Sequence, residues 1–344
     1  MKYLVLLAGL LITMATRAEL VILQYHHVST STPAATSISP ADFKRHLLLL
    51  ASLNKTIVDL PSAIQTLRQG GTLPDNAVAI TFDDAYESIY HNAFPLLAQR
   101  RWPFTVFVNP GTIDAEHEGI MPWQQLREMQ QQGATIANHT QDHPYLIQRP
   151  DNLTLDAWLT QQVDNAEQRI KQEMGQSNRL LAYPYGEYSL AIAEWLQDHD
   201  YLAFGQHSGA VSSQSFWQAI PRYPVAGAYA DPDTLNNKLQ TLALPVASNS
   251  LVDPALGSDN PPELRLTLHS QDLDPDHLRC FASGEGQIDH QVDVTGTTIT
   301  LTTQATQPIT QGRSRYNCTA PSLSKPGYFY WYSQLWINTS VENR

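Results

Sequence analysis

The stretch Val78-Ala79-Ile80-Thr81-Phe82-Asp83-Asp84 decides which class of fold the chain adopts. Its first five residues read as a buried strand, because a strand covered on both faces needs no alternation of apolar and polar residues. The strand runs directly into two carboxylates, and functional side chains of α/β proteins gather where parallel strands end. The stretch therefore predicts a parallel α/β fold with an acidic site at the carboxyl edge of its sheet.

Apolar runs of the same kind recur on both sides of this stretch, separated by longer amphipathic segments. In residues 154–174 the apolar side chains recur every three or four positions and Gly175 ends the pattern, which is typical of a helix. Seven or eight strand–helix units favour a TIM-like barrel over an open sheet. The strands predicted for this α/β domain are 20–25, 56–58, 78–82, 104–108, 135–137, 180–183, 202–204 and 219–223.

The composition and the hydrophobic pattern of the sequence change after Leu244. Residues 249–262 are rich in Ser, Pro, Asp and Asn, which is typical of a linker. Short alternating segments without a helical period follow, so we expect a first domain at 19–249 and a small all-β domain at 250–344. The aromatic run in 328–337 would either stack on a ligand or, as its alternation favours, pack in a core. The strands predicted for the second domain are 264–269, 287–294, 297–302 and 328–337.

Residues 1–18 read as a secretory signal peptide, in which Lys2 precedes an apolar run and Thr16-Arg17-Ala18 precedes Glu19. The apolar run is shorter than the roughly 20 residues that span a bilayer, although an uncleaved anchor is the alternative. We therefore expect an exported protein, periplasmic or secreted, with no membrane insertion after cleavage. In an oxidising compartment the only two cysteines, Cys280 and Cys318, should form a disulfide, and two buried thiols are the alternative.

The chain is acidic, with a net charge of −12. Without a basic patch it has little long-range attraction for phosphate backbones or anionic lipids, so nucleic acid is not an expected partner. Net charge alone favours neutral or cationic substrates.

Two further groups of polar residues follow predicted strands. His139 and His143 come after the strand 135–137, and together with a carboxylate of the Asp83-Asp84 pair they offer a divalent metal two imidazoles and one oxygen. Such a set leaves coordination positions open, as catalytic metal sites do. The alternatives are a helix cap for the aspartates and surface positions for the histidines.

The third group is Tyr183-Pro184-Tyr185-Gly186, which follows the strand 180–183. A backbone N–H in this turn would stabilise an oxyanion, and the tyrosines would wall a sugar pocket; a plain strand-ending turn is the alternative.

With these three motifs, residues 20–245 resemble the polysaccharide deacetylases, the NodB-homology domain of carbohydrate esterase family 4. The resemblance implies that the TIM-like barrel is an irregular (β/α)7 barrel. Thr81-Phe82-Asp83-Asp84 matches the first family motif, which implies that Asp83 is the general base and Asp84 a metal ligand. His139-Thr140-Gln141-Asp142-His143 matches the second and implies that both histidines are the other ligands. Zn²⁺ is the expected ion, with Co²⁺, Ni²⁺, Mn²⁺ and Fe²⁺ as alternatives.

The third family motif is incomplete, because Ala182 stands where the family has an arginine that orients the base. Arg222 is our candidate to replace that arginine or to contact substrate. The rest of the motif implies that the Tyr185 backbone N–H faces the oxyanion. The Tyr-Pro-Tyr-Gly variant resembles the exported Gram-negative branch that acts on poly-N-acetylglucosamine polymers.

The general acid of the family is a histidine in a Leu-x-His motif. Leu266-Thr267-Leu268-His269 matches that motif literally but lies in the second domain, so we treat the match as coincidence. His207 after a late strand is the preferred acid, and His26 at the end of the first strand is an alternative acid and a candidate substrate contact.

The resemblance implies a metal-dependent hydrolase that removes N-acetyl groups from N-acetylglucosamine-containing polysaccharide or oligosaccharide by metal-activated water. Chitin oligomers, poly-β-1,6-N-acetylglucosamine and peptidoglycan all fit, and the oligomeric state stays open. One alternative is a catalytically impaired carbohydrate-binding or matrix protein, which the missing arginine would explain. Another is a glycoside hydrolase that uses Asp83 and a second acid, but this alternative gives His139 and His143 no catalytic role.

Overall fold

The computed structural model describes residues 19–247, 252–269 and 272–341. The predicted signal peptide at 1–18 and the predicted domain boundary between 249 and 250 lie outside these residues. Parallel strands form the first sheet in the order β10-β1-β5-β6-β7-β8-β9, with β4 beside the start of β5. These strands are β1 (Val21–Tyr25), β4 (Thr56–Ile57), β5 (Ala77–Phe82), β6 (Phe104–Val108), β7 (Ala134–Asn138), β8 (Leu180–Ala182), β9 (Leu202–Phe204) and β10 (Tyr223–Pro224).

The stretch 220–224 joins the two ends of this sheet. Ile220 pairs with Phe204 of β9, and Tyr223 in β10 pairs with Leu23 of β1, so the parallel strands close into an irregular barrel. The predicted strand 219–223 is therefore only partly regular, because it changes partner half-way along. This arrangement confirms the predicted (β/α)7-type fold, and residues of β1, β5, β6, β7, β8 and β9 meet in one apolar cluster with α2 packed against them.

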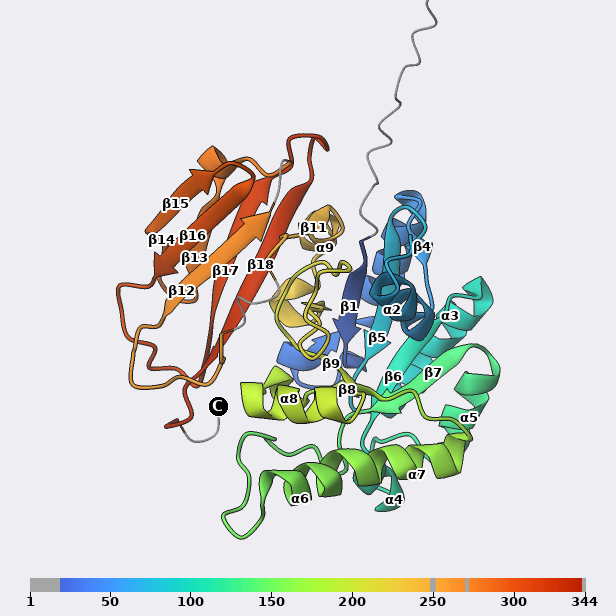
Figure 1. The fold of residues 1–344 in the computed structure, drawn as a ribbon. Helices are drawn as coiled ribbons and strands as arrows, with labels where there is room; N and C mark the ends of the chain where they lie inside the picture. The colour runs from blue at the N-terminus through green and yellow to red at the C-terminus, as the bar shows by residue number, and fades with distance from the viewer. Residues whose placement is uncertain (1–18, 248–251, 270–271, 342–344) are drawn as a thin grey trace, which may run out of the picture.

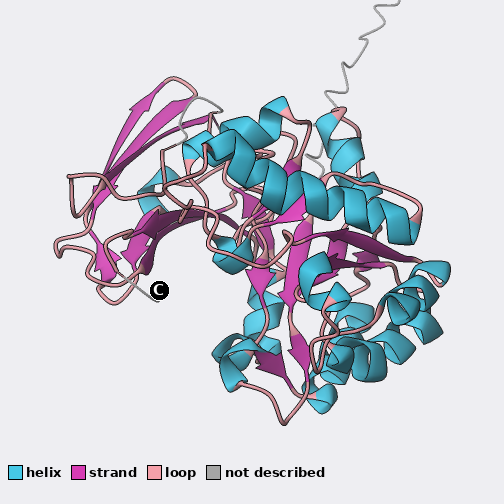
Figure 2. Ribbon diagram, turned by 90° about the horizontal axis from the view of Figure 1, so that it is seen from below, coloured by secondary structure: helices cyan, strands magenta, loops and turns pink. Residues whose placement is uncertain are grey.

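Helices cover the outside of the barrel (Figure 2). Several begin with the expected caps: Ser39 accepts from the backbone N–H of Asp42, and Asp59 accepts from that of Ser62. The predicted helix 154–174 is continuous but contains a π-helical turn, Thr160–Asp164. The α-helices are α1 (Pro40–Ser52), α2 (Leu60–Arg68), α3 (Phe94–Arg100), α4 (Pro110–Asp114), α5 (Trp123–Gln131), α6 (Leu155–Leu159), α7 (Asn165–Met174), α8 (Leu190–Asp198) and α9 (Pro232–Lys238).

The C-terminal region forms two further sheets, which lie against one side of the barrel (Figure 1). One has the order β11-β18-β17-β13-β14 and the other β12-β16-β15. The prediction of one continuous strand over 287–294 is wrong. The chain breaks at Asp289 into β14 and β15, which belong to different sheets. The strands are β11 (Thr241–Ala243), β12 (Glu263–His269), β13 (Arg279–Ala282), β14 (Gly286–Ile288), β15 (His290–Thr295), β16 (Thr298–Gln304), β17 (Arg313–Pro321) and β18 (Phe329–Ile337).

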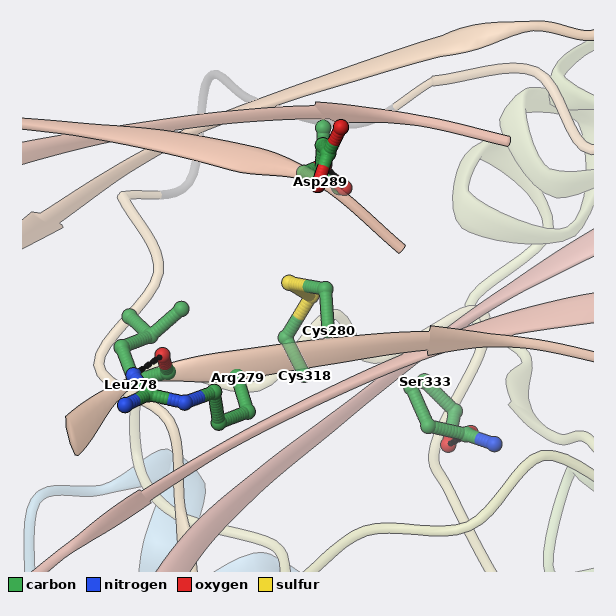
Figure 3. Close-up of a disulfide and its surroundings, with 8 residues drawn as sticks. Leu278, Arg279, Cys280, Asp289, Cys318 and Ser333 are labelled. Carbon is green, nitrogen blue, oxygen red and sulfur yellow. Dashed lines mark hydrogen bonds between the residues drawn. A yellow bond between two sulfur atoms is a disulfide. The ribbon is translucent and has the colours of Figure 1, made fainter. Parts of the chain in front are cut away.

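A disulfide joins the neighbouring strands β13 and β17 (Figure 3). It links Cys280 to Cys318, which face each other directly in the strand register and are both fully buried. Sequence reasoning missed both of these strands, because most of their inward side chains are small rather than large and apolar: Cys280, Ala282, Ser314, Cys318 and Ala320.

The barrel and the C-terminal sheets share apolar contacts along β18. Tyr330 and Trp336 pack inside the C-terminal region, as the alternation of the aromatic run favours. Leu335 and Ile337 instead join the apolar cluster of β8 and α8 in the barrel. No helix among the described residues is long and apolar enough to cross a bilayer.

Candidate metal centre and active site

The loops that follow β5 and β7 bring one carboxylate and two imidazoles together. Asp84 Oδ1 lies 3.3 Å from His139 Nε2 and 3.3 Å from His143 Nε2. The ligand atoms of all three residues lie within 4.8 Å of one another. The structure therefore assembles the three side chains that the sequence predicts as metal ligands, and we call them the Asp84 triad.

The donor set of the triad fits a divalent cation. His139 Nδ1 donates to the backbone oxygen of Ala182 at 2.8 Å, so Nε2 is the ring nitrogen that faces Asp84 and would ligate a cation. This Nε2 is buried and has no hydrogen-bond partner among the described residues. A buried nitrogen without a partner costs free energy, which a bound cation would offset.

The charges of the triad favour a cation as well. Burial opposes ionisation of Asp84, but His139, His26 and His143 outweigh it and hold the pKa of Asp84 well below its usual range. Burial and the neighbouring His139 lower the pKa of His143 to about 4, so this imidazole is neutral and able to bind a metal at pH 7.

The backbone of these loops is strained. Asp84, Thr140, His143 and Tyr185 all have positive φ, between 55° and 71°. Non-glycine residues rarely adopt this conformation, and such strain concentrates at functional sites. Asn109 supports the β7 loop by donating to the backbone oxygens of His139 and Thr140.

Asp83 precedes Asp84 in the chain, and two side chains hold its carboxylate. Arg222 donates from Nη1 to Oδ1 at 2.7 Å and from Nη2 to Oδ2 at 2.9 Å, and Gln24 donates to Oδ2 at 2.7 Å. Burial opposes ionisation of Asp83, but Arg222 outweighs it and holds the pKa of Asp83 below its ordinary value. Asp83 is therefore a fixed, ionised carboxylate beside the triad.

Arg222 comes from the stretch that closes the barrel, whereas the family motif would place an arginine at Ala182. The Arg222 side chain is fully buried, donates from Nε to Gly205 O at 3.0 Å, and lies over the Phe107 ring. It contacts Asp83 rather than lining the cavity described next, which favours the predicted orienting role over direct substrate contact.

A cavity of about 670 Å³ opens onto the triad. Tyr185 forms part of its wall, with its ring stacked on Tyr145 at 3.9 Å and edge-on to His143 at 4.6 Å. The turn that carries Tyr185 needs the following glycine, because a Cβ at Gly186 would lie 2.7 Å from Gln206 Cβ. His26 lines the same cavity, with Nε2 3.9 Å from Asp83 Oδ2.

The structure places two predicted site residues elsewhere. His207 is buried, lines a separate cavity together with Phe216 and Trp331, and has its pKa lowered to about 4 by burial. Tyr183 is fully buried and donates from its hydroxyl to Gln218 O, so it does not wall the cavity at the triad. Both lie near the end of a barrel strand, but neither side chain lines the cavity at the triad.

Sequence reasoning missed several residues of this site. Gln24 donates a hydrogen bond to Asp83, and Tyr86, two residues after Asp84, lines the cavity. Gln24 lies near the end of β1, so the rule that functional residues gather at strand ends would have indicated it. Arg313 and Arg315 line the cavity from β17 in the C-terminal region, and no motif points to them.

Comparisons with known proteins agree with this geometry. Residues 70–204 match the family model described as polysaccharide deacetylase. YxkH of Bacillus subtilis is 27% identical over 210 residues, which are 61% of this chain and 72% of that protein. The poly-beta-1,6-N-acetyl-D-glucosamine N-deacetylase of Staphylococcus aureus is 26% identical over 157 residues, which are 44% of this chain and about half (54%) of that relative's length. The structure of IcaB from Ammonifex degensii matches with a TM-score of 0.57 and 27% identity, covering 65% of this chain and 97% of that chain.

Proposed function

We propose that this protein is a metal-dependent hydrolase that removes N-acetyl groups from N-acetylglucosamine-containing polysaccharide. The match of residues 70–204 to the polysaccharide deacetylase family model supports the proposal. The observation that carries the proposal is the Asp84 triad, which a cavity reaches at Asp84 and His143, together with the Asp83 carboxylate that Arg222 and Gln24 fix beside it. The pairing of Arg222 with Asp83 supports the expected replacement of the family arginine and therefore argues against an impaired protein.

The Asp84 triad would bind the metal, and Asp83 serves as the general base. A divalent cation held by Asp84, His139 and His143 would polarise the acetyl carbonyl and acidify a water molecule. Asp83 accepts the proton of the attacking water, and Arg222 and Gln24 keep its carboxylate in position.

Two groups on the cavity wall complete the site. The Tyr185 backbone N–H donates to the oxyanion of the tetrahedral intermediate. His26 protonates the departing amine, because it lines the cavity beside Asp83 whereas His207 lines another. Export to the periplasm or outside the cell is part of the proposal and rests on residues 1–18.

Acetate release and chain length, measured on chitin oligomers, poly-β-1,6-N-acetylglucosamine and peptidoglycan with Zn²⁺ and with EDTA, test the proposal. Acetate release that EDTA abolishes supports it. Chain shortening that EDTA leaves unchanged would favour a glycoside hydrolase, and saccharide binding without either product would favour a binding protein.

The assignment of the acid has its own test. His26→Ala should lower turnover by about 100-fold or more, since general acids contribute about 10²–10⁴. His207→Ala is the matched control and should change turnover far less; a larger loss at His207 would reverse the assignment.

A further inference from the structure

One strand of the C-terminal region forms part of the wall of the active-site cavity. Alternate residues of β17 point in opposite directions, so that Tyr316 and Cys318 enter the C-terminal core while Arg313 and Arg315 leave it. Both arginines line the cavity that contains Asp84 and His143. The second domain thus contributes two cations to the site of the first.

Arg313 has partners within the protein. Its Nη1 donates to Tyr185 O at 3.0 Å, and its Nε lies 3.7 Å from the carboxylate of the buried Glu187. Arg313 therefore ties β17 to the turn that carries Tyr185, and Glu187 balances its charge.

Arg315 has no such balance. Its Nη2 donates to the backbone oxygen of Gln206 at 3.2 Å, and its Nε is buried without a hydrogen-bond partner among the described residues. No ion pair of Arg315 occurs in that part of the chain. Burial and the charge of Arg313 lower the pKa of Arg315, so keeping this cation in place costs free energy.

Among the described residues, no carboxylate on the cavity wall forms an ion pair with Arg315. Asp84 is the single acidic side chain among the described residues that line the cavity, and the imidazoles of the triad surround it. Asp83 does not line the cavity and is paired with Arg222. A planar guanidinium with unused donors matches a carboxylate better than it matches a hydroxyl group.

We propose that Arg315, supported by Arg313, binds a carboxylate of the substrate, so that the preferred polymer carries an acidic sugar next to the N-acetylated one. This inference rests on the proposed function and names its substrate class. The carboxylate would come from a uronic acid or from a lactyl ether on the sugar ring. The net charge of −12 opposes such a polymer only at long range, and salt screens that repulsion beyond about 10 Å.

The test compares three probes that differ in charge. Chitin hexaose is neutral, a heparosan oligosaccharide alternates N-acetylglucosamine with glucuronate, and a peptidoglycan glycan strand carries lactyl carboxylates. Acetate release is measured on the Zn²⁺-loaded protein. Binding is measured by calorimetry on the full chain in EDTA, so that the carboxylate cannot bind a cation at the triad.

For wild type we expect a higher kcat/KM for at least one acidic probe than for chitin hexaose. Arg315→Gln should lower the acidic-to-neutral ratio of kcat/KM by about 10- to 100-fold, the effect of losing hydrogen bonds to a charged group. A general folding defect would lower both activities and leave the ratio unchanged. Arg315→Lys should restore part of the preference, and Arg265→Gln on the exposed face of β12 is the charge-matched control.

A ratio that Arg315→Gln leaves unchanged would overturn the inference, as would a wild-type preference for chitin hexaose. Failure of the proposed function is separate: if no probe releases acetate but an acidic probe binds in an Arg315-dependent manner, the carboxylate site stands without deacetylation. If neither acidic probe binds, the inference is wrong. The two acidic probes also identify whether the carboxylate belongs to a uronic acid or a lactyl ether.

Discussion

Replacing Arg222 by glutamine should release the Asp83 carboxylate from the position in which it serves as a base. Arg222 makes two hydrogen bonds to Asp83, at 2.7 and 2.9 Å, and both side chains are fully buried. Removing one partner of a buried ion pair typically costs about 3–5 kcal/mol, because the other charge is left uncompensated. We therefore expect the free energy of unfolding to fall by about that amount.

Turnover should fall by more than the loss of folded protein alone would explain. A general base contributes about 10²–10⁴ to the rate, and Asp83 in the variant is held by Gln24 alone, so turnover should fall by about 100-fold or more. Metal content should stay at the wild-type level, because Arg222 makes no contact with Asp84, His139 or His143 among the described residues.

A double-mutant cycle measures the pair directly. Arg222→Gln, Asp83→Asn and the double variant are compared by urea unfolding, acetate release and metal content, with Arg265→Gln as the exposed control. In the double variant two neutral amides face each other, so the coupling free energy should be at least about 2 kcal/mol. Asp83→Asn by itself should abolish turnover while the metal stays bound. A folded, metal-loaded Arg222→Gln with turnover within about threefold of wild type would refute the positioning role.

Three further predictions concern the metal, the disulfide and pH. His139→Ala should lose bound Zn²⁺ and acetate release together, because it removes a ligand; metal analysis that finds full occupancy would contradict this. Converting Cys280 and Cys318 to serine should lower the free energy of unfolding by about 3–4 kcal/mol, since the bridge spans 38 residues, and should leave kcat unchanged; an unaltered urea midpoint would count against it. Burial lowers the pKa of His46 from 6.5 to about 4, so the unfolded chain binds the proton first and stability falls as pH drops from 6.5 toward 4. The loss from His46 should reach about 3 kcal/mol and be smaller in His46→Gln; identical pH profiles of urea unfolding for the two proteins would rule this out.

The amino-acid sequence determined the barrel and the three motifs, because their signals are local. A strand buried on both faces must be apolar along its length, and the residue that follows it lies at the carboxyl edge of the sheet. This rule was enough to place Asp84, His139 and His143 in loops that meet, since β5, β6 and β7 are neighbours in the sheet.

Only the tertiary structure decided which distant residues complete the site. Arg222 is 139 residues from Asp83, and it reaches the carboxylate because the stretch 220–224 closes the barrel beside β1. His207 follows a barrel strand as His26 does, but its side chain turns to another cavity. Arg315 lies in a different sheet altogether and enters the cavity because β17 packs beside the loops that follow β8 and β9. Such contacts depend on the packing of whole elements, to which no short pattern of residues corresponds.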